Sequence, residues 1–367
     1  MVKYIFILGK TPRLSIAEIR AVLPQFKVRQ ADDCCLIGET GRFDCQEIIN
    51  RLGGTVKIGI YLGSKIASEP ILAAADSRPA GQRFNFGFSF YGTKPLSPGL
   101  KIKKLLKDQG RSARLVTSRE PALSSVIVKK EKCQDYLVGP GWFGATCAVQ
   151  DFKEYAALDY GRPQADAFSG MLPPKLAKIM LNLSGIAASD ILVDPFCGSG
   201  TIINQALERG NRNIIGCDLS PKAVSDAQKN ADWIVDKLKI GNCKLKIFQC
   251  DARQLSQKIN PGSVAAIVTE PFLGQPIKGN EKEQTIKNIV SEVEELYAAA
   301  IGQFKQALRP GGRVVLVVPQ WHVGGRIHKF DIDKLIQSAG FKRLDQDDLI
   351  YFRPEQKVWR QIVIFEK

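Results

Sequence analysis

Short apolar runs alternate with amphipathic segments along the C-terminal half of the chain. Runs rich in Val, Ile and Phe predict five strands, at residues 191–196, 213–219, 244–251, 265–271 and 312–320. Apolar residues at helical spacing predict the intervening helices, at residues 201–208, 221–238, 285–308 and 332–339. Strands that alternate with helices indicate an α/β fold, with a mostly parallel sheet covered on both faces.

Two more strands are predicted near the C-terminal end, at residues 342–346 and 361–366. No helical pattern separates them, so we expect them to form an antiparallel pair at one edge of the sheet. The predicted sheet therefore has seven strands.

The N-terminal half lacks this regular alternation. Residues 1–70 predict a small α+β unit with strands at 4–8, 35–38 and 57–62 and helices at 15–23 and 43–52. Residues 82–150 predict a second unit, with strands at 84–91 and 114–117, helices at 99–109 and 122–130, and further strands after them. We expect residues 70–81 to link the two units, and residues 151–172 to link them to a C-terminal domain at 173–367.

Positive charge is concentrated in the first 150 residues. The chain has 52 basic and 37 acidic residues, a net charge of +15, and residues 1–150 contribute +11 of it. Residues 83–132 alone hold twelve basic and three acidic side chains. A polyanion is the expected partner of this half, and the alternative is a solvated basic surface without a specific partner.

Cysteine, histidine and apolar content exclude several classes of protein. The nine cysteines contain no Cys-x-x-Cys pair, and an odd count fits a reduced cytoplasmic compartment. The two histidines, His322 and His328, lack zinc spacing, so neither a zinc site nor a Ser-His-Asp hydrolase is expected, and we expect no metal. Apolar runs are too short to cross a bilayer, and no secretion signal is visible.

The most informative motif is the octapeptide DPFCGSGT at residues 194–201, where a predicted strand meets a predicted helix. Its glycines allow a ligand to approach the backbone, and the helix start offers free N–H groups. A dinucleotide fingerprint requires a third small residue where Ile203 stands, and Asp194 suits a cation better than a pyrophosphate. The alternative is a tight turn without a ligand.

The octapeptide resembles motif I of S-adenosylmethionine-dependent methyltransferases, in the subgroup that methylates exocyclic amines of nucleic-acid bases. The resemblance implies a Rossmann-like methyltransferase sheet and S-adenosylmethionine as cofactor. Asp218, at the end of the next strand, can accept two hydrogen bonds from a ribose diol. Asp251 stands where the family places an acid beside the adenine amine, and a turn aspartate is the alternative. The predicted cofactor-binding residues are Asp194, Phe196, Gly198, Gly200, Thr201, Asp218 and Asp251.

The fourth predicted strand ends in Thr269-Glu270-Pro271-Phe272, where amine methyltransferases carry D/N-P-P-Y/F. An exocyclic amine is a poor nucleophile, so its N–H groups need acceptors and its nitrogen must be aligned with the methyl group. An aromatic ring stacks on the flipped base. Pro271 and Phe272 match this pattern, whereas Thr269 and Glu270 depart from it. All four are predicted catalytic residues, with Glu270 or Thr269 as the amine acceptor.

Other segments extend the resemblance to tRNA guanosine-N2-methyltransferases that modify position 10, in the D-stem. These are residues 7–18, residues 171–177, and the group Gln150, Asp151, Phe152, Tyr155, Asp159, Arg162 and Pro163. The family has an N-terminal ferredoxin-like unit, a THUMP domain that grips the tRNA acceptor end, and then the methyltransferase. The resemblance thus implies a ferredoxin-like unit at 1–70 and a THUMP domain at 82–150. The predicted RNA-binding residues are Lys101, Lys103, Lys104, Lys107, Arg111 and Arg114.

The leading hypothesis is a cytoplasmic tRNA methyltransferase that acts on guanine N2, monomeric apart from a small activating partner subunit. One alternative is an adenine-N6 methylase of DNA or RNA, which shares the cofactor loop. Another is a non-catalytic RNA-binding homologue that lost turnover at Thr269-Glu270. A nicotinamide dehydrogenase is opposed by Ile203.

Overall fold

The computed structural model describes residues 1–79, 81–151, 161–164, 171–344 and 348–367. The chain divides into two compact units. The first comprises residues 1–12 and 23–155, and the second comprises residues 13–22 and 156–367. Phe152, Tyr155 and Asp159, which contribute to the family resemblance, lie outside the described residues.

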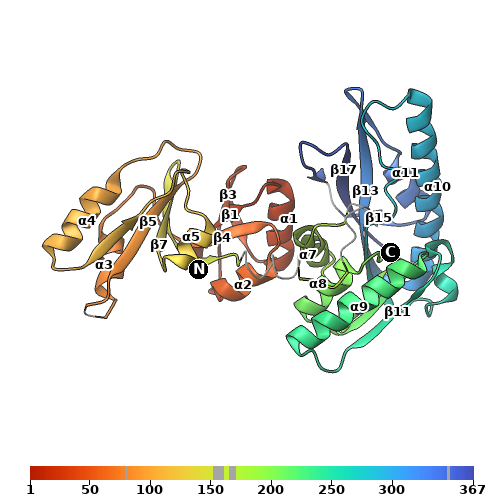
Figure 1. Ribbon diagram of the computed structural model, residues 1–367, viewed down its shortest axis with the longest axis horizontal. Coiled ribbons are helices and arrows are strands. Elements are labelled where there is room, and N and C mark those ends of the chain that lie inside the picture. Colours follow the sequence, from red (N-terminus) through yellow and green to blue (C-terminus); the bar gives the residue numbers. More distant parts are fainter. Residues whose placement is uncertain (80, 152–160, 165–170, 345–347) are drawn as a thin grey trace. The chain divides into compact units, whose positions relative to one another are not determined.

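The first unit is built on one eight-stranded sheet with the strand order β2-β3-β1-β4-β8-β7-β5-β6. Its strands are β1 (Val2–Leu8), β2 (Lys27–Ala31), β3 (Cys35–Thr40), β4 (Thr55–Gly63), β5 (Phe84–Phe90), β6 (Ala113–Val116), β7 (Gln134–Gly139) and β8 (Trp142–Val149). Its helices are α2 (Cys45–Arg51), α3 (Glu69–Asp76), α4 (Pro98–Asp108) and α5 (Ser125–Lys130). Helices α3 and α4 pack with the phenylalanines of β5 in one apolar core (Figure 1).

The two N-terminal segments predicted as separate units share this sheet, because β4 pairs antiparallel with β8 from Lys57 opposite Val149 onward. The prediction of a linker at residues 70–81 was wrong, since most of it is helix α3, which buries Ile71 and Ala75. Strand β2 was missed because all five of its residues are exposed, which leaves no apolar alternation to detect.

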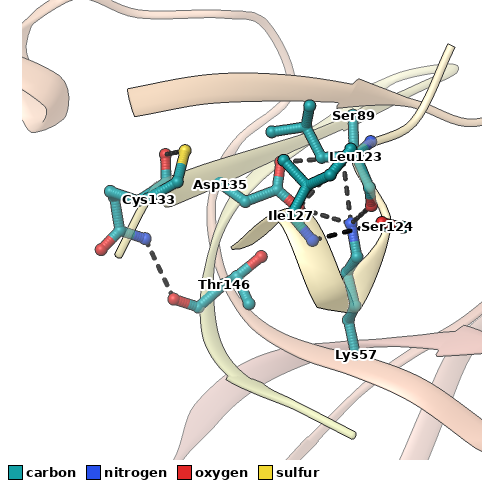
Figure 2. Close-up of polar contacts among 9 residues, drawn as sticks. Lys57, Ser89, Leu123, Ser124, Ile127, Cys133, Asp135 and Thr146 are labelled. Carbon is teal, nitrogen blue, oxygen red and sulfur yellow. Dashed lines mark hydrogen bonds and ion pairs between the residues drawn. The ribbon is translucent and has the colours of Figure 1, made fainter. Parts of the chain in front are cut away.

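A buried polar network crosses the middle of the first unit. The Lys57 ammonium, on β4, donates to Asp135 Oδ2 at 2.5 Å, to the Leu123 carbonyl at 2.6 Å and to Ser89 Oγ at 3.0 Å (Figure 2). Ser89 in turn donates to Asp135 Oδ1 at 2.8 Å and accepts from the Leu123 N–H at 2.9 Å. The Lys57 and Asp135 side chains are 1% and 0% exposed, so each charge is neutralised inside the protein.

The cysteines depart from the prediction of a fully reduced set. Cys45, in α2, and Cys147, in β8, form a disulfide with 6.0 Å between their Cα atoms. This pair escaped prediction because the two residues are 102 positions apart and only the tertiary fold brings them together. The other seven cysteines, all within described residues, are free.

The second unit contains the predicted α/β domain. Its strands are β9 (Ile191–Asp194), β10 (Asn213–Asp218), β11 (Lys244–Gln249), β12 (Val264–Thr269), β13 (Leu308–Val323), β14 (Arg326–His328), β15 (Lys342–Arg343), β16 (Leu349–Tyr351) and β17 (Val358–Glu366). Its helices are α1 (Pro12–Val22, from residue 13), α7 (Pro174–Leu183), α8 (Thr201–Arg209), α9 (Pro221–Leu238), the 3-10 helix η1 (Ala252–Gln257), α10 (Glu283–Ala307) and α11 (Ile332–Ser338).

The sheet of the second unit has nine strands. The seven predicted strands form the path β11-β10-β9-β12-β13-β17-β15, and two short strands that were not predicted, β14 and β16, pair with β13 and β17. The first five strands of this path are parallel, and β17 is antiparallel to β13 and to β15, as predicted for the last two strands. Residues 345 and 346 of the predicted sixth strand lie outside the described residues. Helices α7, α8 and α9 cover one face, and α10 and α11 cover the other (Figure 1).

Local sequence explains where the main helices begin. Ser220 caps α9 by accepting a hydrogen bond from the Ala223 N–H, and Pro221 occupies the first helical position. Helix α8 begins instead at Gly200, which has no side chain to cap its free N–H groups. Among the described residues, every helix is too short or too polar to span a lipid bilayer.

Candidate active site

Acidic side chains gather where the parallel strands of the second unit end. Asp194 and Asp218 are the last residues of β9 and β10, Asp251 lies two residues beyond β11, and Glu270 follows β12. Because these strands are neighbours and parallel, their carboxyl ends meet at one edge of the sheet. All four acids line a single cleft of about 1530 Å³.

Asp194 is a buried carboxylate without a cationic partner. Its Oδ1 accepts a hydrogen bond from the Thr269 hydroxyl at 2.7 Å and from the Phe196 N–H at 3.3 Å. Within the described part of the chain, no Lys, Arg or His forms an ion pair with it. Burial raises the pKa of Asp194 to about 7, although the two hydrogen bonds oppose the shift. The site therefore favours a ligand that brings its own positive charge.

The glycine loop between β9 and α8 is held from both sides. Gly198 and Gly200 have φ angles of 51° and 85°, which favour glycine, and a Cβ on Gly200 would lie 3.2 Å from the Ala227 backbone of α9. The Gly198 N–H donates to Asp218 Oδ2 at 3.0 Å. Asn230, in α9, donates to the Ser199 carbonyl at 2.8 Å. These contacts define the conformation of the loop.

Asp218 and Asp251 have different surroundings. Asp218 accepts backbone N–H groups from Gly198 and Ser220, at 3.0 and 2.9 Å, which leaves further lone pairs for hydroxyl donors in the cleft. Both oxygens of Asp251 accept hydrogen bonds from the Arg253 guanidinium, which lowers the pKa of Asp251. Asp251 also caps the 3-10 helix η1.

Thr269 and Glu270, the first two residues of the amine-site motif, make different contacts. Thr269 is 0% exposed, does not line the cleft, and donates its hydroxyl to Asp194. Glu270 lines the cleft and accepts from the Arg360 Nε at 2.5 Å. Burial raises the pKa of Glu270, and the Arg360 charge opposes that shift. Glu270 is therefore the acid of this motif that faces a ligand.

Pro271 and Phe272 complete the cleft beside Glu270. Pro271 is buried and Phe272 is 43% exposed, and both line the cleft. The cleft exceeds the range of roughly 300–1,000 Å³ that holds one drug-sized ligand, so it can take a cofactor and a base together. Its lining includes eight carboxylates but four basic side chains, which suits a cationic ligand.

The structure brings together most of the predicted cofactor and catalytic residues. Asp194, Phe196, Gly198, Thr201, Asp218 and Asp251 line the cleft with Glu270, Pro271 and Phe272. Gly200 is buried against α9. Thr201 accepts a hydrogen bond at 3.0 Å from Arg162, which is itself buried.

The predicted RNA-binding residues lie in the first unit. Lys101, Lys103, Lys104 and Lys107 are exposed on α4, and in the described part of the chain none of them forms an ion pair. Arg111 and Arg114 are paired with Asp76 and Glu131, at 2.9 and 2.7 Å. The four lysines are therefore better placed than the two arginines to contact phosphates.

Sequence reasoning missed Arg360 and Asn230. Arg360 lies 90 residues from Glu270, so no local motif joins them. The signal available was a charged residue within a strand rich in apolar residues, since a charge that becomes buried needs a partner. Asn230 is fully buried in α9, and a buried amide in a helix also requires hydrogen-bond partners.

Comparison with protein families identifies the domain that carries this cleft. Residues 163–323 match a family described as RMKL-like, methyltransferase domain. Residues 70–229 also match a family described as DNA methylase.

Curated relatives are similar over part of their length. A tRNA (guanine(10)-N2)-dimethyltransferase from Methanothermobacter thermautotrophicus is 30% identical over 172 residues, 46% of this chain and 42% of that protein. A tRNA (guanine(6)-N(2))-methyltransferase from Bos taurus is 33% identical over 150 residues, 39% of this chain and 27% of that protein. The chain thus matches less than half the length of these relatives.

A solved structure supports the fold. The crystal structure of TrmN from Thermus thermophilus has a TM-score of 0.54 and 16% sequence identity, and the alignment covers 100% of this chain and 99% of that one. Together these findings confirm the family resemblance seen in the cofactor loop. Residues 163–323 match the RMKL-like methyltransferase domain family, and part of the chain is similar to tRNA guanine-N2-methyltransferases.

Proposed function

We propose that the protein transfers a methyl group from S-adenosylmethionine to guanine N2 of tRNA. The observation that carries this proposal is Asp194, a buried carboxylate without an ion-pair partner among the described residues, set beneath a preformed glycine loop. Its surroundings fit a donor with a positive sulfur and an amino group. The relatives, named as tRNA guanine-N2-methyltransferases, favour this substrate over adenine.

The cofactor residues have distinct roles in this proposal. S-adenosylmethionine, when bound, supplies a methyl group activated by a positively charged sulfur. Asp194 attracts the cationic end of that molecule, and Thr269 fixes the orientation of the carboxylate through its hydroxyl. Asp218 accepts hydrogen bonds from ribose hydroxyls. Asp251 stays ionised through Arg253 and accepts from the adenine amine.

Glu270 replaces the usual acid or amide of the amine site. Its carboxylate accepts an N–H of the guanine amino group, which orients the nitrogen lone pair toward the methyl group. Arg360 holds Glu270 in place and balances its charge. Phe272 stacks on the guanine ring. Methyl transfer to N2 would break the bond between the methyl carbon and the sulfur, leaving a neutral thioether, and Glu270 would accept the proton that N2 loses.

The first unit serves as the tRNA-binding part in this proposal. We assign a ferredoxin-like unit to residues 1–70, a THUMP domain to residues 82–150 and a linker to residues 151–172. The element order of residues 1–63, strand-helix-strand-strand-helix-strand, supports the first assignment, and its first helix, α1, falls almost entirely in the second compact unit. The lysines of α4 support a polyanionic ligand. Modification at position 10, a cytoplasmic location and a small activating subunit remain predictions that follow from the family.

Nucleoside analysis of methylated tRNA tests the proposal. The full chain is incubated with unmodified tRNA and methyl-labelled S-adenosylmethionine, and the tRNA is digested and separated by chromatography. We expect N2-methylguanosine or its dimethyl form, and none with Asp194→Ala. Methyladenosine would support the adenine-N6 alternative instead. No incorporation, with RNA binding retained, would support the non-catalytic alternative.

Glu270→Gln separates the role of Glu270 from that of the cofactor pocket. The amide keeps one acceptor oxygen but loses the charge that pairs with Arg360. We expect methyl transfer to fall by roughly 10²-fold, as for other positioned proton-transfer groups, with cofactor binding unchanged. An unchanged rate would mean that Glu270 is not the amine acceptor.

A further inference from the structure

Beside the cleft, three rings stack on one another across neighbouring strand ends. The Trp359 ring, on β17, lies between Phe352 and His322, with ring centroids 4.3 and 3.8 Å away. Phe352 follows β16, and His322 lies on β13. Phe352 is 43% exposed, and one face of its ring packs on Trp359.

The stack continues the cleft and has a largely basic rim. Gln356, Lys357 and Val358, in the segment between Phe352 and Trp359, line the cleft. Ile327, opposite His322 in the β13–β14 pair, extends the apolar row and is 56% exposed. Three exposed basic side chains lie in the adjoining turns, namely Lys329, Arg353 and Lys357, whereas Arg326 alternates with Ile327 along β14 and points to the other face. Carboxylates near these residues in the described part of the chain include Glu355, Glu281 and Glu283; Glu281 accepts hydrogen bonds from the Lys278 and Gly279 N–H groups, and Glu283 is paired with Lys287.

The cleft is mainly acidic and its rim is mainly basic, so the two surfaces favour different parts of a nucleic acid. Carboxylates outnumber basic side chains in the cleft lining by eight to four, and three of the basic ones are paired with Asp226, Asp251 and Glu270. The net negative charge disfavours phosphate groups in the cleft, so we expect a nucleic acid that inserts a base there to keep its backbone near the rim, where Lys357 lies. When a base leaves the RNA helix, the bases on either side of it lose a stacking partner. An exposed aromatic face next to basic side chains provides both the stacking and the charge that such neighbours need.

We propose that the ring stack Phe352–Trp359–His322, with its basic rim, binds the unstacked RNA nucleotides that flank the base inserted in the cleft. This inference rests on the proposed function for the identity of the nucleic acid. The surface lies within the second unit, so it is a contact of the methyltransferase domain itself, separate from the lysines of α4.

Equilibrium binding of unmodified tRNA to the full chain tests this surface without methyl transfer. We expect Phe352→Ala to raise the tRNA dissociation constant about tenfold, within the range of losses seen when a stacking ring is removed. Phe352→Trp, which keeps a ring, stays within about threefold of wild type. Leu238→Ala is the matched control, because Leu238 is 41% exposed on α9, and it binds as wild type. S-adenosylmethionine affinity, measured by calorimetry, is unchanged in all three variants.

Unchanged tRNA binding by Phe352→Ala, or an equal loss in Leu238→Ala, would overturn the proposal. The two hypotheses fail in different ways. If wild type forms methylguanosine and Phe352→Ala binds tRNA as tightly, the surface is refuted and the proposed function stands. If wild type transfers no methyl group and Phe352→Ala still loses RNA affinity, the proposed function is refuted and the surface stands.

Discussion

Each of the two units buries a carboxylate, but in opposite circumstances. In the first unit, Asp135 is held by the Lys57 ammonium and the Ser89 hydroxyl, and attraction by Asp135 raises the pKa of Lys57 despite burial. In the second unit, Asp194 receives a hydroxyl and a backbone N–H but, within the described residues, no cation. Breaking an internally neutralised pair destabilises a fold because it leaves an uncompensated buried charge, whereas a buried acid without a cation is a candidate binding site.

The two units also differ in the charge of their exposed surfaces. The first unit exposes a row of lysines on α4, whereas the cleft of the second unit is lined mainly by acids. A polyanion and a cationic cofactor therefore have separate places on the chain. This division predicts that changes to the two buried acids and to the lysines will have separable effects.

The largest effect is expected from removing the cation of the first unit. Lys57→Met leaves Asp135 charged, buried and without its cation, so we expect a loss of about 3–5 kcal/mol in the free energy of unfolding. Urea denaturation of the full chain, followed by circular dichroism, measures this loss.

A double variant provides the control for that change. Lys57→Met with Asp135→Leu removes both charges, so it loses less stability than Lys57→Met alone. If Lys57→Met cost less than 1 kcal/mol, the network would not be the internally neutralised pair described here.

In the second unit, we expect replacement of the buried acid to raise the free energy of unfolding. Asp194→Asn removes a carboxylate whose pKa is raised to about 7 by burial, while Asn Oδ1 still accepts from Thr269. Above pH 7 the folded protein must hold this charge in a buried site. We therefore expect the variant to be more stable than wild type at pH 8, by roughly 3–4 kcal/mol.

The sign of this effect depends on pH. A raised folded-state pKa means that the folded protein binds more protons than the unfolded chain between pH 4 and 7, so stability falls as pH rises through that range. Thermal unfolding at pH 8 and at pH 4 tests this. The stability advantage of Asp194→Asn must shrink toward pH 4, and an advantage independent of pH contradicts the assigned cause.

The smallest effect concerns the lysines of α4. We expect Lys104→Gln to weaken tRNA binding a few-fold and to reduce the slope of log affinity against log salt by about one. Lys246→Gln, an exposed lysine on β11 of the second unit, is the control and leaves both quantities unchanged. Equal effects of the two variants would show that α4 is not a specific RNA contact.

Much of the second unit could be predicted from sequence because its signals are local. Each strand is a short apolar run, and Ser220-Pro221 marks the start of α9 at the predicted residue. The acids that end β9 and β10 follow directly from strand position, and parallel neighbours bring them together.

The features missed depend on long-range contacts. Pairing of β4 with β8 joins the two predicted N-terminal units, and no local pattern specifies which strands pair. Arg360 reaches Glu270 from a strand 90 residues away. The hydrogen bond that the Thr269 hydroxyl donates to Asp194, on the neighbouring strand, also could not be read from the sequence, because the two residues are 75 positions apart.

Calorimetric titration with S-adenosylmethionine tests the central claim, that Asp194 is a buried acid whose cation comes from the ligand. We predict that wild type binds at pH 8 and about tenfold more weakly at pH 6, because the carboxyl is protonated below its pKa of about 7. Asp194→Asn binds weakly, without this dependence on pH. Wild type that fails to bind, or Asp194→Asn that binds as tightly as wild type at pH 8, would contradict the account.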